Sequence, residues 1–134
     1  MALTVQGGCP LLQVWDMPTA IAFYRDILGF EVLETNDPAP GDDVDWCWLR
    51  AGTVELMLNT QYERDERPAG QDPARRAIHA DTCLFRGCQD LDAARTHLLA
   101  HGIEAPPPVT RDYGMRQLGF QDPDGYGICL QWKA

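Results

Sequence analysis

Alternating apolar and polar residues predict most of the strands of this chain. Near the C-terminal end, Leu118 and Phe120 alternate with polar or small residues, and Ile128, Leu130 and Trp132 do the same further on. Side chains of a strand point to its two faces in turn, so each run has one apolar face and one mixed face. The mixed face is suited to lining a cavity.

A turn sequence, DPDG at residues 122–125, joins these two runs and predicts a tight hairpin. Pro123 fixes φ at the first corner, and Gly125 supplies a residue that tolerates positive φ. A second hairpin is predicted from residues 46–49 and 54–58, which flank another glycine turn. Further strands are expected at residues 9–15, 30–33 and 82–89, and beginning at Ile103 and Glu104.

The first predicted helix, Pro18–Leu28, has both a start and a stop signal. Asp16 is a good N-cap, and Pro18 sits in the first turn, where its missing N–H costs little. Gly29 is the residue type expected just after the last turn.

A second predicted helix, Leu91–His101, repeats this arrangement, with Asp90 as its N-cap and Gly102 closing it. Asp90 lies 74 residues after the first cap, and Gly102 lies 73 residues after the first closing glycine. Strand, cap, helix, glycine and strand therefore occur twice, which indicates an internal repeat. Each half supplies one helix and about four strands in βαβββ order. Two such modules side by side form a cup with a lined interior.

The stretch between the two halves has charge, proline and glycine but no sustained period. We interpret it as a mobile connector with one short helical turn at Pro73–Ile78. The predicted organisation is one domain, residues 1–134, with modules at about 8–60 and 81–134 and a connector at about 60–80.

Arg86 departs from the repeat, because strict alternation points it at the helix layer, where an unpaired charge is costly. Two resolutions stay open: a bulge that shifts the register, or a side-chain stem that reaches outward.

Composition narrows the class of partner. The 134 residues are 45% hydrophobic and 23% charged, as expected for one globular domain with a real core. The net charge of −9 argues against nucleic acid and against anionic membrane surfaces. No run of about 18 apolar residues is present to span a membrane. A neutral or cationic small molecule suits this charge better.

Five cysteines are present, an odd number with no CxxC pair, in a chain too large to need disulfide staples. The N-terminal sequence MALTVQGGCP has no basic or apolar region typical of a signal peptide. A reducing cytoplasm is the expected setting.

Three segments carry a resemblance to a known family: DMPTAIAFYRDILGF, DLDAARTHLLAHGI and GFQDPDGYG. Together they resemble the vicinal oxygen chelate superfamily, which contains glyoxalase I, extradiol dioxygenases and bleomycin-resistance proteins. The resemblance covers nearly the whole chain. It implies an α+β fold in which two βαβββ modules form a curved mixed β-sheet cup with helices on the outside. It also implies a homodimer.

In metal-dependent members of that superfamily, four inward residues, usually His, Gln or Glu, hold a divalent ion. Matching the strands places Cys9, Glu55, Cys83 and Cys129 in these four slots. Only Glu55 is of the family type. The cysteines are interpreted as small residues in an apolar cup, with a thiolate-rich Zn²⁺ or Cu(I) site as the alternative. No cofactor is therefore expected, and a divalent metal ion is the alternative.

The inward face is predicted to bind a ligand. Trp46, Trp48 and Met57 give flat apolar walls that suit planar or cationic molecules. Tyr113 and Arg111 lie in the loop before the last hairpin, where they can close over a ligand. The predicted ligand-binding residues are Gln13, Trp46, Trp48, Glu55, Met57, Tyr113, Gln117 and Gln131.

Two function classes stay open. A protein that sequesters a small, cationic or aromatic molecule without a catalytic metal is favoured, as the resemblance to bleomycin-resistance proteins implies. A metal-dependent lyase, isomerase or dioxygenase is the alternative. No catalytic residue can be assigned, although Glu55 is the best candidate for a general base, because burial in an aromatic cup would raise its pKa.

Overall fold

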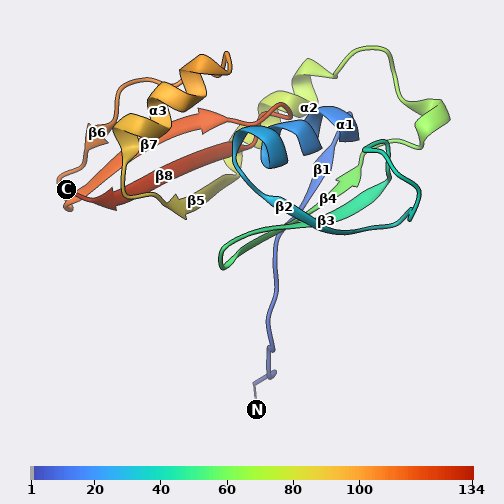
Figure 1. Ribbon diagram of the computed structural model, residues 1–134, viewed down its shortest axis with the longest axis horizontal. Coiled ribbons are helices and arrows are strands. Elements are labelled where there is room, and N and C mark those ends of the chain that lie inside the picture. Colours follow the sequence, from blue (N-terminus) through green and yellow to red (C-terminus); the bar gives the residue numbers. More distant parts are fainter. Residues whose placement is uncertain (1) are drawn as a thin grey trace. The chain divides into compact units, whose positions relative to one another are not determined.

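The computed structural model describes residues 2–134. The chain forms two compact units, the first ending at Pro68 and the second beginning at Ala69. Each unit is a βαβββ module with its own mixed four-stranded sheet (Figure 1). No helix in this range is long and apolar enough to cross a membrane.

The sheet of the first unit has the order β1-β4-β3-β2, with β1 parallel to β4 and the other neighbours antiparallel. A 3₁₀ turn at Arg64–Glu66 follows the last strand. The elements are β1 Leu11–Val14, α1 Met17–Ile21, η1 Ala22–Ile27, β2 Glu31–Thr35, β3 Trp46–Ala51 and β4 Val54–Thr60.

The helix of the first unit begins and ends as predicted. The Asp16 carboxylate accepts a hydrogen bond from the Thr19 backbone N–H, and Pro18 occupies the first turn. The α-helical α1 continues as the π-helical η1, and Gly29 follows it with φ +82°. This helix covers one face of the sheet, where Leu49 pairs with Leu56 and both are fully buried.

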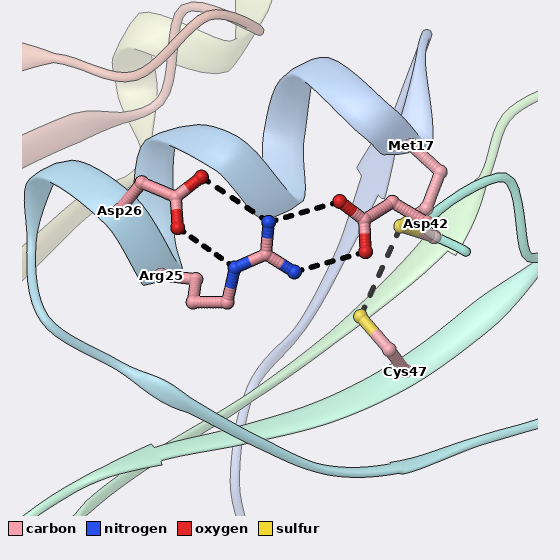
Figure 2. A network of polar contacts seen from close by, with 5 residues as sticks. All are labelled: Met17, Arg25, Asp26, Asp42 and Cys47. Carbon is pink, nitrogen blue, oxygen red and sulfur yellow. Dashed lines mark hydrogen bonds and ion pairs between the residues drawn. The ribbon is translucent and has the colours of Figure 1, made fainter. Parts of the chain in front are cut away.

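The loop between β2 and β3 is tied to this helix by Arg25 (Figure 2). The Arg25 guanidinium lies 2.8 Å from Asp26 Oδ1 and 2.9 Å from Asp42 Oδ1. The bonds to Asp26 and Asp42 raise the pKa of Arg25, and the bond from Arg25 lowers the pKa of Asp26. Below this ion pair, the thiol of Cys47 lies 3.8 Å from the sulfur of Met17.

The second unit repeats the topology, with strand order β5-β8-β7-β6. Its core lies between α3 and the sheet and contains Leu91, Leu98, Leu118, Phe120 and Ile128. Matching strand orders confirm both the internal repeat and the α+β class. The elements are β5 Cys83–Gly87, α3 Leu91–Ala100, β6 Val109–Thr110, β7 Met115–Gln121 and β8 Gly127–Lys133.

The strand expected to begin at Ile103 and Glu104 is a wrong prediction. Both residues lie in irregular chain, and β6 begins only at Val109. Prolines occupy positions 106–108, and a proline has no N–H to donate to a neighbouring strand. Strand pairing therefore starts at the first residue after them, where Val109 pairs with Gln117.

The end of the predicted connector, within residues 71–81, packs against the rest of the second unit. The predicted helical turn is present as α2, Pro73–Ile78, and the 3₁₀ turn η3, His79–Asp81, follows it. Gln71 Nε2 donates to the Pro123 carbonyl at 3.0 Å. The His79 ring stacks on Tyr126 with centroids 4.1 Å apart. This segment thus packs onto the turn of the last hairpin, inside the second unit.

Arg86 keeps the alternation of its strand. β5 pairs with β8 in unbroken register from Cys83 to Gly87, so there is no bulge in this strand pair, and Arg86 stands opposite Leu130. The side chain donates from Nη1 to the Phe85 carbonyl at 3.0 Å, at the solvent-exposed side. Of the two open resolutions, the outward-reaching stem is the one observed.

Candidate functional site

The sheet of the first unit has an open face opposite α1. Trp48 stands opposite Met57 on this face, and Leu11 flanks Met57 on the other side. The predicted register is confirmed, because the neighbouring positions Cys47 and Leu49 are fully buried on the helix side. All five residues predicted to contribute from this half share the open face: Gln13, Trp46, Trp48, Glu55 and Met57.

Two features of this face were not predicted. The indole Nε1 of Trp48 is buried and has no hydrogen-bond partner among residues 2–134. A buried donor without a partner lowers stability by about 1–3 kcal/mol, and such groups are rare in folded proteins. Arg50 stands directly opposite Glu55, and residues paired in this way have Cβ atoms about 5 Å apart. The hairpin register predicted from sequence would have found Arg50.

The sheet of the second unit also has an open face, and a pocket of about 520 Å³ lies on it. Phe85 stands beside Cys129, and Gly119 stands on the other side of Cys129. The absence of a side chain at Gly119 leaves room, since nothing lies within 4 Å of where its Cβ would be. The other lining residues are Cys83, Pro106, Pro107, Val109, Arg111, Gln117, Phe120, Gln121, Gly127 and Ile128.

A polar cluster reaches this pocket, because two of its four members, Arg111 and Gln117, line it. Its centre is Gln117, whose side chain is only 9% exposed. Arg111 Nε donates to Gln117 Oε1 at 3.0 Å. Gln117 Nε2 donates to Tyr113 Oη and to Gln131 Oε1, both at 3.0 Å. The three residues predicted from this half, Tyr113, Gln117 and Gln131, are thus brought together.

The candidate metal ligands are divided between the units. Cys9, just before β1, and Glu55 belong to the first unit, and Cys83 and Cys129 to the second. Over residues 2–134, neither unit groups three His, Cys, Asp or Glu side chains as a metal site requires. Desolvation raises the pKa of the Cys83 and Cys129 thiols, so a metal would have to displace their protons. Over the described residues, neither unit by itself therefore holds a complete set of metal ligands.

The histidines are engaged elsewhere in the second unit. The His79 Nδ1 lies 2.7 Å from the Asp124 carbonyl, which can only accept, so Nδ1 carries the proton. His97 and His101 lie one turn apart at the exposed side of α3, with ring centroids 4.4 Å apart. None of the three lines the pocket.

Comparison with known proteins decides the family. The sequence model of the Glyoxalase/Bleomycin resistance protein/Dioxygenase superfamily matches residues 8–130. The chain belongs to this superfamily. The superfamily resemblance read from the helix and turn segments is therefore confirmed. Among curated proteins, no sequence matches the chain.

Solved structures of the superfamily fold cover nearly the whole chain. TnmS3, an antibiotic binding protein from Streptomyces sp. CB03234, is 23% identical, with a TM-score of 0.66 over 98% of this chain and 100% of that one. A bleomycin-binding protein from Streptomyces verticillus, solved with copper(II)-bleomycin, is 20% identical, with a TM-score of 0.63 over 96% and 97%. TioX from Micromonospora sp. ML1 is 19% identical, with a TM-score of 0.69 over 96% and 97%. Identities this low establish the glyoxalase/bleomycin-resistance fold alone.

Proposed function

We propose that this protein binds a small, planar aromatic molecule on the open faces of its sheets and does so without a catalytic metal. The pocket on the second unit carries the proposal. Its volume of about 520 Å³ falls in the range of small-molecule sites, about 300–1,000 Å³. Such sites combine apolar walls with a few placed polar groups, and Phe85 and Gln117 are of these two kinds.

The tryptophans supply the aromatic part of the proposal. Trp48 and Met57 form a flat apolar surface, and Trp46 adds a second indole on the same face. A ligand atom that accepts a hydrogen bond from Trp48 Nε1 would relieve the cost of that buried donor. Stacking on an indole contributes about 0.5–1.5 kcal/mol beyond the buried area.

A preference for cations at this face is not part of the proposal. Arg50 stands opposite Glu55 in the strand register, which places a positive charge on the same face as the carboxylate. We therefore expect shape and stacking, rather than positive charge, to select ligands at this face.

The family supports sequestration as the activity. TnmS3 is an antibiotic binding protein, and the Streptomyces verticillus protein binds copper(II)-bleomycin. By analogy of fold, this chain holds a ligand instead of converting it. The ligands of those two proteins are not proposed for this one.

Tryptophan fluorescence tests the proposal. Wild-type protein is screened against planar aromatic compounds, and the affinity of a hit is compared in the Trp46→Phe, Trp48→Phe and Trp132→Phe variants. We expect Trp48→Phe to weaken binding about tenfold, because the variant loses one hydrogen bond and part of the stacking. Trp132, a half-exposed residue on the other face of β8, is the matched control and should change nothing. Equal affinity in all variants would make the Trp46 and Trp48 wall structural.

The absence of a catalytic metal needs its own experiment. Protein purified without chelator is analysed for bound metal. We expect less than stoichiometric amounts. Stoichiometric metal that disappears in Glu55→Ala, Cys83→Ala or Cys129→Ala would favour the lyase, isomerase or dioxygenase alternative.

We also propose a homodimer in a reducing cytoplasm, on the superfamily resemblance and on the five free cysteines. Sedimentation at micromolar concentration should give twice the chain mass of 15.0 kDa. A species of one chain mass would contradict the dimer.

A further inference from the structure

The hydrogen bonds around Gln117 fix which atoms of the cluster have partners within it. An arginine Nε–H can only donate, so the Gln117 atom that meets it must be the carbonyl Oε1. Gln117 Nε2 then has to point at its two other partners, Tyr113 and Gln131. Both partners must accept from it. The orientation of the amides follows from Arg111 and is not arbitrary.

In these hydrogen bonds each oxygen of the cluster acts as an acceptor, and several N–H and O–H donors have no partner. Gln117 Oε1, Tyr113 Oη and Gln131 Oε1 each receive a proton from within the cluster. Both Nη atoms of Arg111, the O–H of Tyr113 and the Nε2 of Gln131 have no further partner among residues 2–134. The atoms of the cluster left without any partner are therefore nitrogen donors, and the Arg111 guanidinium among them carries a positive charge.

The rest of the pocket wall is apolar or weakly polar. Phe85, Val109 and Pro107 supply carbon surface. The thiols of Cys83 and Cys129 stay protonated at neutral pH, because desolvation raises their pKa. Arg111 is thus the only formal charge among the lining residues of this pocket. Its Nε bond to the buried Gln117 limits the freedom of the guanidinium, which lowers the entropic cost of a bidentate contact.

We propose that the second-unit pocket takes ligands that carry a carboxylate on an aromatic body, with the carboxylate held by the guanidinium of Arg111, which lines the pocket. This rests on the proposed function and names the ligand class of one of its faces. It runs against the net charge of −9, which repels anions at long range. The selectivity is local and survives at about 0.15 M salt, where charges more than about 8 Å apart are screened.

Three probes of one shape test the proposal: 2-naphthoate, neutral 2-naphthamide and cationic 2-naphthylmethylamine. Each is titrated at neutral pH into ¹⁵N-labelled full-length protein, and shifts of the β7 and β8 amides report binding at this pocket. We expect naphthoate to bind at least about tenfold more tightly than the amine, and Arg111→Gln to remove that advantage. The affinity for naphthamide should change less than about threefold in the same variant.

Arg75→Gln is the matched control, because it removes one positive charge from the same unit at a position that does not line the pocket. Equal naphthoate affinity in Arg111→Gln and Arg75→Gln would overturn the proposal, and so would tightest binding of the amine. If no probe moves these amides, this ligand class is also wrong. The proposed function is judged separately, by whether Trp48→Phe weakens a hit from the fluorescence screen.

Discussion

The two units share a topology, and their helix-facing sides are alike, but their open faces are not. Leu49 and Leu56 in the first unit and Leu118 and Ile128 in the second are buried aliphatic side chains beneath a helix. The open faces differ in kind: the first has two tryptophans and has Glu55 opposite Arg50, and the second has thiols, glutamines and one arginine. Packing tolerates only apolar residues of suitable volume, whereas an open face is free to diverge with its ligand.

The largest expected effect separates packing from binding within one strand. Leu49→Ala should lower the free energy of unfolding by about 2–5 kcal/mol, because the side chain is fully buried. Its neighbour Trp48 lies on the open face, and Trp48→Phe should change the free energy of unfolding by about 1 kcal/mol or less, because loss of the unpartnered Nε1 donor offsets the lost indole surface. Chemical denaturation of both variants checks this. Equal losses would mean that the open face is a second core.

The hairpin turns of the two units give the next comparison. Gly52 and Gly125 both have positive φ, +60° and +88°, so alanine is strained at either. Gly52→Ala should cost about 1–2 kcal/mol, since nothing lies within 4 Å of the new Cβ. At Gly125 the Cβ would clash with the Arg76 carbonyl oxygen, which adds about 1–3 kcal/mol of overpacking. Similar denaturation midpoints for both variants would show that residues 71–81 are not docked as described.

The docking of residues 71–81 could not be predicted from the sequence. Asp16, Gly29, Asp90 and Gly102 each carry a local signal, so the helices and the repeat could be predicted. The docking of residues 71–81 has no such signal, because it depends on contacts with a turn about 50 residues later. The prolines at 106–108 likewise prevent strand pairing, so β6 begins later than the local sequence pattern predicted.

The candidate site divides in the same way. Strand alternation, which is local, assigned Trp48 and Glu55 to the open face correctly. Orientation within the polar cluster depends on which atom of Gln117 meets Arg111, and no sequence pattern encodes that contact. Arg50, which was not among the predicted site residues, is also the cross-strand neighbour of Glu55 in the hairpin register.

Stability in alkali should distinguish the thiols of the two units. Burial raises the pKa of Cys47 from 9.0 to about 12, so its contribution is present below pH 9 and is lost as the pH rises toward 12. Cys47→Val should therefore flatten the fall in unfolding free energy between about pH 8 and pH 10.5. Cys88→Val in the second unit is the control, where partial burial also raises the thiol pKa. If both variants flatten the pH dependence of the unfolding free energy equally, the two thiols do not differ as described.

The smallest effect concerns Gly119, on the open face of the second unit. A glycine inside a strand costs about 0.5–1 kcal/mol relative to alanine, and a Cβ here would meet nothing within 4 Å. Gly119→Ala should thus raise the unfolding free energy by that amount while reducing the space in the pocket that this residue lines. Thermal unfolding measures the first effect and naphthoate affinity the second. A destabilised variant would show that this face is packed and not open.

The side-chain N–H signals of the labelled protein test the central claim most directly, that the open faces bind and the helix faces pack. In a titration with a hit from the fluorescence screen, we predict that the indole N–H of Trp48 or the side-chain amide of Gln117 shifts with ligand concentration. The indole N–H of Trp132, which is on the other face of β8, should stay in place. Shifts confined to Trp132 and to the backbone of α1 and α3, with Trp48 and Gln117 unmoved, would contradict the account.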